Sequence, residues 1–95
     1  MLGHYVLDGH KTILCPDPMM WAKWYETAER RVEHTTITED IYVSTVFLGL
    51  NHNYGSGPPL LFETMVFGGA RDGDCSRYST WDEAERGHQE VVDSL

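Results

Sequence analysis

The residues best suited to contact a ligand are concentrated in one short segment, 51–59, which reads NHNYGSGPP. A histidine exchanges a proton near neutral pH, and amide and phenol groups bind polar ligands or peptides. Glycines let the backbone come close to a ligand, and the two prolines stiffen the end of the segment. We predict a binding role for Asn51, His52, Asn53, Tyr54 and Ser56. The alternative is a solvent-exposed turn in which Asn and Gly only reverse the chain.

A second candidate is Glu63, which lies inside the apolar run LLFETMVF. A carboxylate in an apolar strand needs either solvent or a buried partner. If it were buried beside His52 or Arg77, it would be suited to act as a base. If it lay on the solvent face, it would form a simple ion pair. We include Glu63 among the predicted binding residues and leave both interpretations open.

Metal and nucleophile chemistry finds little support in the sequence. The five histidines are scattered without metal-ligand spacing, and Cys15 and Cys75 form no Cys-x-x-Cys motif. No Ser or Cys lies in the sequence context of a nucleophile elbow. We therefore predict binding rather than catalysis, with no metal, no other cofactor and two free thiols. His88 is expected to be half-buried and hydrogen-bonded.

The charge of the chain limits its partners. Fifteen acidic residues against seven basic ones give a net charge of −8, which opposes direct binding to nucleic acid. The last helical segment carries five carboxylates and a single arginine, Arg86. The helix dipole accounts only for the two carboxylates in its first turn. We add Glu85, Glu90 and Asp93 to the predicted binding residues, facing a partner with a basic surface.

These candidates depend on a small set of predicted elements. Residues 4–15 are expected to form a hairpin around Asp8-Gly9, and residues 18–34 an amphipathic helix capped by Asp17. Residues 41–69 are expected to form a long-looped hairpin, followed by a polar loop over 70–79. Thr80 and Glu83 match the capping box of a second helix, which runs to the end of the chain.

The predicted order is ββαββα in a single α+β domain, residues 1–95. We expect a mostly antiparallel four-stranded sheet with two helices packed on one face. Eight residues are predicted to be mostly buried between sheet and helices: Trp21, Trp24, Val43, Phe47, Phe62, Val66, Trp81 and Ala84. The opposite sheet face would be half apolar, which favours cover by a partner or by a second copy of the chain in a homodimer.

The sequence contains neither of two features that would direct the protein to a membrane or out of the cell. No apolar run is long enough to cross a bilayer, and the segment MLGHYVLDGHK has no basic region followed by an apolar one. We expect a cytoplasmic protein with no membrane partner.

Most of the chain resembles a known family, and the most specific segments of this resemblance are PPLLFETMVFGG and TWDEAERGH. The longer string VSTVFLGLNHNYGSGPPLLFETMVFGG resembles a family of small uncharacterised proteins encoded by bacteriophages and prophages. The resemblance implies a phage origin and action in the cytoplasm of the host cell, and it implies no particular chemistry. By analogy with small acidic phage proteins, it favours binding to host machinery.

Three functions remain open from the sequence. The first is a phage accessory protein that binds a host protein and inhibits it, with a nucleic-acid-handling defence complex as the target. The second is a small-molecule or nucleotide-signal binding protein that uses the 51–59 loop. The third is a structural module of the virion or of its assembly.

Overall fold

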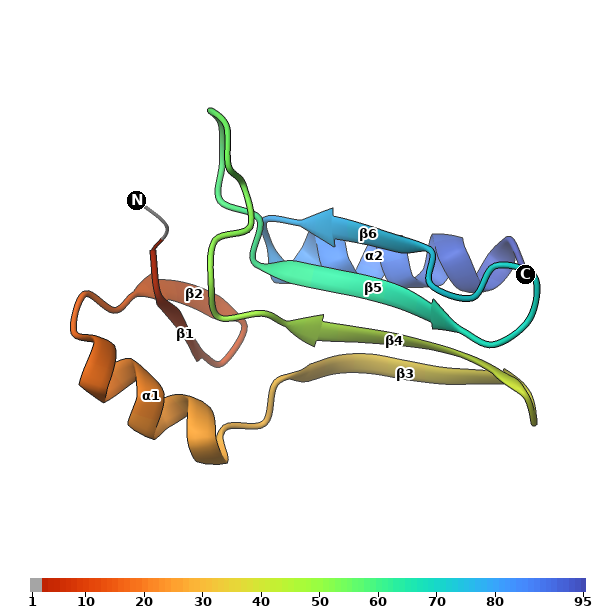
Figure 1. Ribbon diagram of the computed structural model, residues 1–95, viewed down its shortest axis with the longest axis horizontal. Helices are drawn as coiled ribbons and strands as arrows, with labels where there is room; N and C mark the ends of the chain where they lie inside the picture. The colour runs from red at the N-terminus through yellow and green to blue at the C-terminus, as the bar shows by residue number, and fades with distance from the viewer. Residues whose placement is uncertain (1–2) are drawn as a thin grey trace.

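The chain forms two helices and two antiparallel sheets over residues 3–95, which the computed structural model describes (Figure 1). Strands β1 and β2 pair with each other, and the remaining strands form a four-stranded sheet in the order β3-β4-β5-β6. The elements in chain order are β1 (Tyr5–Asp8), β2 (Lys11–Leu14), α1 (Pro18–Thr27), β3 (Arg31–Thr38), β4 (Ile41–Phe47), β5 (Phe62–Phe67), β6 (Cys75–Tyr78) and α2 (Trp81–Asp93).

The predicted fold class is confirmed: the domain is α+β, with two helices and a four-stranded antiparallel sheet. The assignment of strands to that sheet differs from the prediction. The N-terminal hairpin is a separate sheet, and its place is taken by β3 and β6, so the order is ββαββββα.

The predicted helix 18–34 is too long. Asp17 caps it as expected, because its Oδ1 accepts hydrogen bonds from the backbone N–H groups of Met19 and Met20. The helix ends at Thr27, and β3 begins at Arg31. The segment Val32–Thr38 is rich in β-branched residues, which favour a strand over a helix.

Two turns also differ from the prediction. The loop predicted over 70–79 contains the short strand β6, which pairs with β5 through Met65 opposite Cys75. In the first hairpin the strands end at Asp8 and resume at Lys11, so the two turn residues are Gly9 and His10. Only Gly9 has a positive φ, as in a type II′ turn.

The core lies between the four-stranded sheet and α2, which packs across all four strands behind the sheet in Figure 1. Inward-facing residues alternate along β4 and β5, as a half-buried sheet requires. The predicted core residues Val43, Phe47, Phe62, Val66 and Ala84 are at most 1% exposed.

The three tryptophans are half-buried rather than buried, because α1 and the β1–β2 hairpin pack against one end of the core. Trp24 meets the ring of Phe47 edge-on at 5.8 Å, and the indole N–H of Trp21 donates to the carbonyl of Tyr5. At the hairpin tip, His10 stacks on Trp81 at 3.8 Å. These contacts attach the N-terminal unit to the sheet and to α2.

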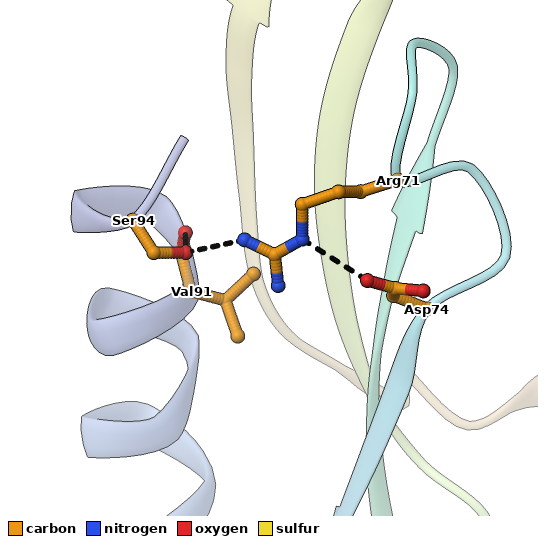
Figure 2. A network of polar contacts seen from close by, with 4 residues as sticks. All are labelled: Arg71, Asp74, Val91 and Ser94. Carbon is orange, nitrogen blue, oxygen red and sulfur yellow. Dashed lines mark hydrogen bonds and ion pairs between the residues drawn. The ribbon is translucent and has the colours of Figure 1, made fainter.

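The C-terminal end of α2 is attached to the β5–β6 connection by one arginine (Figure 2). The Arg71 guanidinium donates to Ser94 Oγ at 2.7 Å and pairs with Asp74 at 3.0 Å. Ser94 in turn donates to the carbonyl of Val91. The network holds the last turn of α2 beside the sheet.

The face of the sheet opposite α2 is uncovered, as predicted, and we call it the open face. None of its side chains is buried. The strand register places eleven residues on it: Arg31, His34, Thr36, Tyr42, Ser44, Val46, Glu63, Met65, Phe67, Cys75 and Arg77. No helix among residues 3–95 combines the length and apolar character needed to cross a bilayer.

Candidate functional site: an uncharged finger beside an acidic helix

Residues 48–61 connect β4 to β5 and project well beyond the end of the sheet in Figure 1; we call them the finger. The base of the finger is held on both sides. Leu48 N–H donates to the carbonyl of Leu61 at 2.7 Å, and Leu61 N–H donates to Tyr78 at the end of β6. On the other side, Asn51 N–H donates to the carbonyl of Gly3, and His4 forms a β-bridge with Leu50.

The upper part of the finger is held by its own asparagines. Asn51 Oδ1 accepts from the backbone N–H groups of Asn53 and Leu60, at 2.8 and 3.0 Å, so one side chain joins the two arms. Asn53 Oδ1 accepts from Gly55, and its amide nitrogen donates to the carbonyls of Ser56 and Pro58. These hydrogen bonds fix the finger in one shape.

The structure therefore places Asn51 and Asn53 in the predicted segment, but the Oδ1 atoms of both and the amide nitrogen of Asn53 form hydrogen bonds within the finger itself. His52 is half-buried, and its Nδ1 lies 2.9 Å from the carbonyl of Leu50. Because a carbonyl only accepts, Nδ1 is the donor in this contact. Of the five predicted finger residues, Tyr54 and Ser56 are exposed.

The tip of the finger presents Tyr54, whose exposed fraction of 77% is the highest among the exposed large hydrophobic residues of the described chain. The whole finger, LGLNHNYGSGPPLL, has no charged residue, although 23% of the chain is charged. Because the loop is stiff, it loses little conformational entropy when another surface covers it. Because it has no charged group, no charge has to be removed from water.

Glu63 lies away from the finger tip, on the open face. It pairs with Arg77 on β6 at 3.0 Å, in the register position directly opposite. The sequence left open whether Glu63 is a buried base or forms an ion pair on the solvent face. The structure shows the ion pair. His52 is on the finger and does not contact Glu63 within the described hydrogen-bond network.

The predicted acidic residues lie along the outer surface of α2, and all are exposed. Trp81 donates its indole N–H to Glu85 at 2.6 Å, and Gln89 donates to Asp93 at 2.8 Å. Glu83 completes the capping box with Thr80. Because the finger base is bonded to Tyr78, just before α2, the first turns of the acidic helix begin beside the finger. Glu90 and Asp93 lie toward the other end.

The predicted site residues thus occupy three places: the finger, the open face and the outer surface of α2. The base of the finger is bonded to Tyr78, just before α2, and a shallow surface depression on the N-terminal half of α2 is lined by Asp82, Glu85 and Arg86. Asp82 was absent from the predicted binding residues because the helix dipole explains its position. The backbone contacts of Gly3 and His4 with the finger join segments that are distant in the chain. No local sequence pattern predicts these contacts.

Within residues 3–95, the one buried histidine is His88 on α2, which is 2% exposed. Its Nε2 lies 2.8 Å from the hydroxyl of Thr35 and its Nδ1 lies 2.7 Å from that of Thr45. Thr45 also shares a hydrogen bond with Thr64 on β5. The histidine is therefore hydrogen-bonded as predicted, but it is fully buried. The network joins α2 to three strands and stabilises the packing of the helix on the sheet.

Burial lowers the pKa of His88 below its ordinary value of 6.5; the charge of Glu33 opposes this shift and His34 adds to it. The unfolded chain therefore binds a proton at this position at a higher pH than the folded chain does. The stability that neutral His88 contributes is complete above about pH 6.5 and declines as the pH falls from there.

We expect the free energy of unfolding to fall between pH 7.5 and 5.5, by at most about 1.4 kcal/mol per pH unit for this single proton. Urea unfolding at the two pH values measures the change. His88→Gln removes the titrating group, so it should reduce the slope. Equal slopes in the parent and in His88→Gln would contradict this assignment.

Metal-binding groups and thiols add no further candidate. Within residues 3–95, no three His, Cys, Asp or Glu side chains are grouped so that they could hold a metal ion. Both Cys15 and Cys75 are free thiols in the structure, the first half-buried and the second exposed. The finger and the adjoining acidic helix therefore remain the main candidate site.

Comparison with known proteins adds no relative to this picture. No family model, no curated protein and no solved structure matches the chain. Any function must therefore be argued from the finger and the surfaces around it.

Proposed function

We propose that the protein acts by binding another protein, without a catalytic step, and that the finger is its recognition element. The observation that carries the proposal is the combination of a fixed shape with an exposed, uncharged tip. Asn51 and Asn53 stabilise the arms, and Tyr54 is left outside any core. Folding needs only a short turn between β4 and β5, so a stiff extension of this length is suited to contact.

The chemistry of the finger favours a protein partner over a nucleotide. Phosphate groups are recognised by cations and by clusters of free backbone N–H groups, and the finger has no Lys or Arg. Several of its N–H groups are already bonded to Asn51 and Asn53 side chains. Tyrosine and proline side chains are common anchors at protein interfaces.

The acidic helix extends the proposed site and indicates the charge of the partner. Asp82, Glu83 and Glu85 lie beside the finger base, so a partner that seats on the finger also meets negative charge. We propose a host protein with a basic surface, such as one that handles nucleic acid, which this surface would block as an inhibitor. This function continues the one that the resemblance to phage proteins implies.

The exposed residues of the tip provide the first test. Tyr54→Ala should change the free energy of unfolding by less than about 0.5 kcal/mol, because the side chain is largely in water. It should weaken binding to the partner by about tenfold or more, as loss of an aromatic anchor does. Lys23→Ala, on the exposed side of α1, is the control and should leave binding unchanged. Retained affinity in Tyr54→Ala would place the site elsewhere.

Charge reversal tests the contribution of α2 separately. Glu85→Lys should weaken binding at low salt, and the loss should shrink as the salt concentration rises, because exposed charges are screened. Affinity that is equal at all salt concentrations in the parent and in Glu85→Lys would exclude a basic partner surface at this end of the helix. The finger could then still be the recognition element.

A further inference from the structure

We propose that the open face is the interface of a homodimer, in which two copies of the chain stack sheet on sheet in antiparallel orientation. This inference does not depend on the finger, which lies at the end of the sheet and stays free in such a dimer. It follows from the aromatic residues of the open face and from the distribution of charge over it.

A preformed aromatic row crosses three strands of the open face. Tyr42 on β4 stacks on Phe67 of β5 at 4.7 Å and 12°, and on His34 of β3 at 5.0 Å and 27°. Both faces of the Tyr42 ring are thereby occupied, so the row presents ring edges to the outside. Ring edges suit packing against apolar side chains, whereas stacking on sugars or bases needs free ring faces.

Apolar side chains continue beside this row. Val46 and Met65 lie between the aromatic row and the end of the sheet from which the finger projects. Both are half-buried, although no helix or strand covers them. A sheet face of this kind is commonly covered by a second sheet, with side chains of both inner faces interdigitating. Because the aromatic row is already ordered, covering it costs little additional side-chain entropy.

The charge of the open face identifies the occupant as a second copy. The face has only three charged residues, Arg31, Glu63 and Arg77, although the chain as a whole has a net charge of −8. Two copies that met through their other, acidic surfaces would repel each other. The open face is a broad surface on which two copies of this acidic chain can meet without that repulsion.

The orientation follows from the two ends of the same face. Arg31 and Arg77 lie at the end near the finger, since they pair with Val46 and Glu63 in the register. The β3–β4 turn at the other end carries Glu39 and Asp40, next to the aromatic row. A two-fold axis that runs across the strands places the arginine end of each copy over the acidic turn of the other. The face is therefore complementary to itself.

Sedimentation velocity of the purified full chain tests the proposal, from micromolar to near-millimolar concentration. We expect a concentration-dependent dimer. Met65→Lys, at the centre of the face, should raise the dissociation constant by about tenfold or more. Gln89→Lys adds the same charge on the outer surface of α2 and should leave the dimer unchanged. A monomer at all concentrations, or a dimer equally stable in Met65→Lys, would overturn the proposal.

The orientation has its own test. Arg31→Glu and Glu39→Arg should each weaken the dimer, and the double variant Arg31→Glu/Glu39→Arg should restore it, because the two positions face each other across the two-fold axis. A double variant weaker than both single variants would overturn the antiparallel arrangement.

Thiol reactivity tests the same face in the unmodified protein, in case Met65→Lys fails to fold. Cys75 is exposed on the open face, opposite Met65. Its rate of reaction with a maleimide should fall as the protein concentration rises, whereas that of Cys15 should not. A Cys75 rate that is independent of concentration, or that falls only when a different protein is added, would overturn the homodimer and assign the face to another occupant.

Discussion

Thr45→Val should lower the free energy of unfolding by about 2–3 kcal/mol, although it changes neither the volume nor the branching of the side chain. The Thr45 hydroxyl is fully buried and meets both Thr64 Oγ1 and His88 Nδ1. Valine leaves both partners buried without this hydrogen bond, and no water can replace it in a site that is closed to solvent. Urea unfolding at pH 7.5 measures the effect.

Thr36→Val is the matched control, because Thr36 is an exposed threonine on the open face of β3. This change should be close to neutral, since valine has a high preference for strands. A loss in Thr45→Val no larger than the change in Thr36→Val would contradict the role given to the buried network. The comparison separates the lost hydroxyl from any general effect of replacing threonine in this sheet.

Gly87→Ala should destabilise the protein by about 2 kcal/mol, against the usual gain of alanine in a helix. A Cβ at position 87 would overlap the Tyr78 ring, which packs against the core from β6. The ring must leave its place, and its packing against the core is lost. Thermal or urea unfolding measures the change, and Gly55→Ala, whose Cβ would meet only Asn53 Oδ1 at 3.6 Å, should have little effect.

A double-mutant cycle makes this second prediction specific. In a Tyr78→Ala background the steric conflict is absent, so Gly87→Ala should stabilise the protein, by up to about 1 kcal/mol through helix propensity. The change of sign is the expected result. If Gly87→Ala destabilises the Tyr78→Ala variant as much as the parent, the close contact between β6 and α2 is not the reason for the glycine.

Local signals in the sequence identified those parts of the fold that short-range chemistry determines. Asp17 and the pair Thr80–Glu83 mark the helix starts, because capping involves residues close in the chain. The apolar, β-rich runs of the predicted long-looped hairpin contain four of the predicted core residues, Val43, Phe47, Phe62 and Val66. The α+β class and five of the eight predicted core residues follow from these signals.

The segment after α1 shows where such signals fail. Val32 continues the helical stripe of Trp21, Trp24, Tyr25 and Ala28, and it also begins the β-branched run of β3. The choice between helix and strand is made by pairing with β4, through contacts such as Thr35 opposite Val43. Strand β6 reads Cys-Ser-Arg-Tyr and has no apolar alternation, so its pairing with β5 leaves no trace in the sequence.

For the candidate site, the sequence indicated the location of the finger and not its internal construction. A loop rich in Asn, Gly and Pro between two strands is recognisable from composition. That Asn51 joins the two arms, and that Gly3 and His4 hold the base, depends on three-dimensional proximity. The buried contacts of His88 with Thr35, Thr45 and Thr64 are likewise formed across the tertiary structure.

Photo-crosslinking from the finger tip tests the central claim most directly. A benzophenone amino acid at position 54, in protein expressed in bacterial cells, should form a covalent product with one cellular protein on irradiation. The same probe at position 23, on the exposed side of α1, should not form it. The mass of the product distinguishes a partner from a second copy of this 10.9 kDa chain. The same products from both positions, or none from position 54, would contradict the account of the finger as a recognition element.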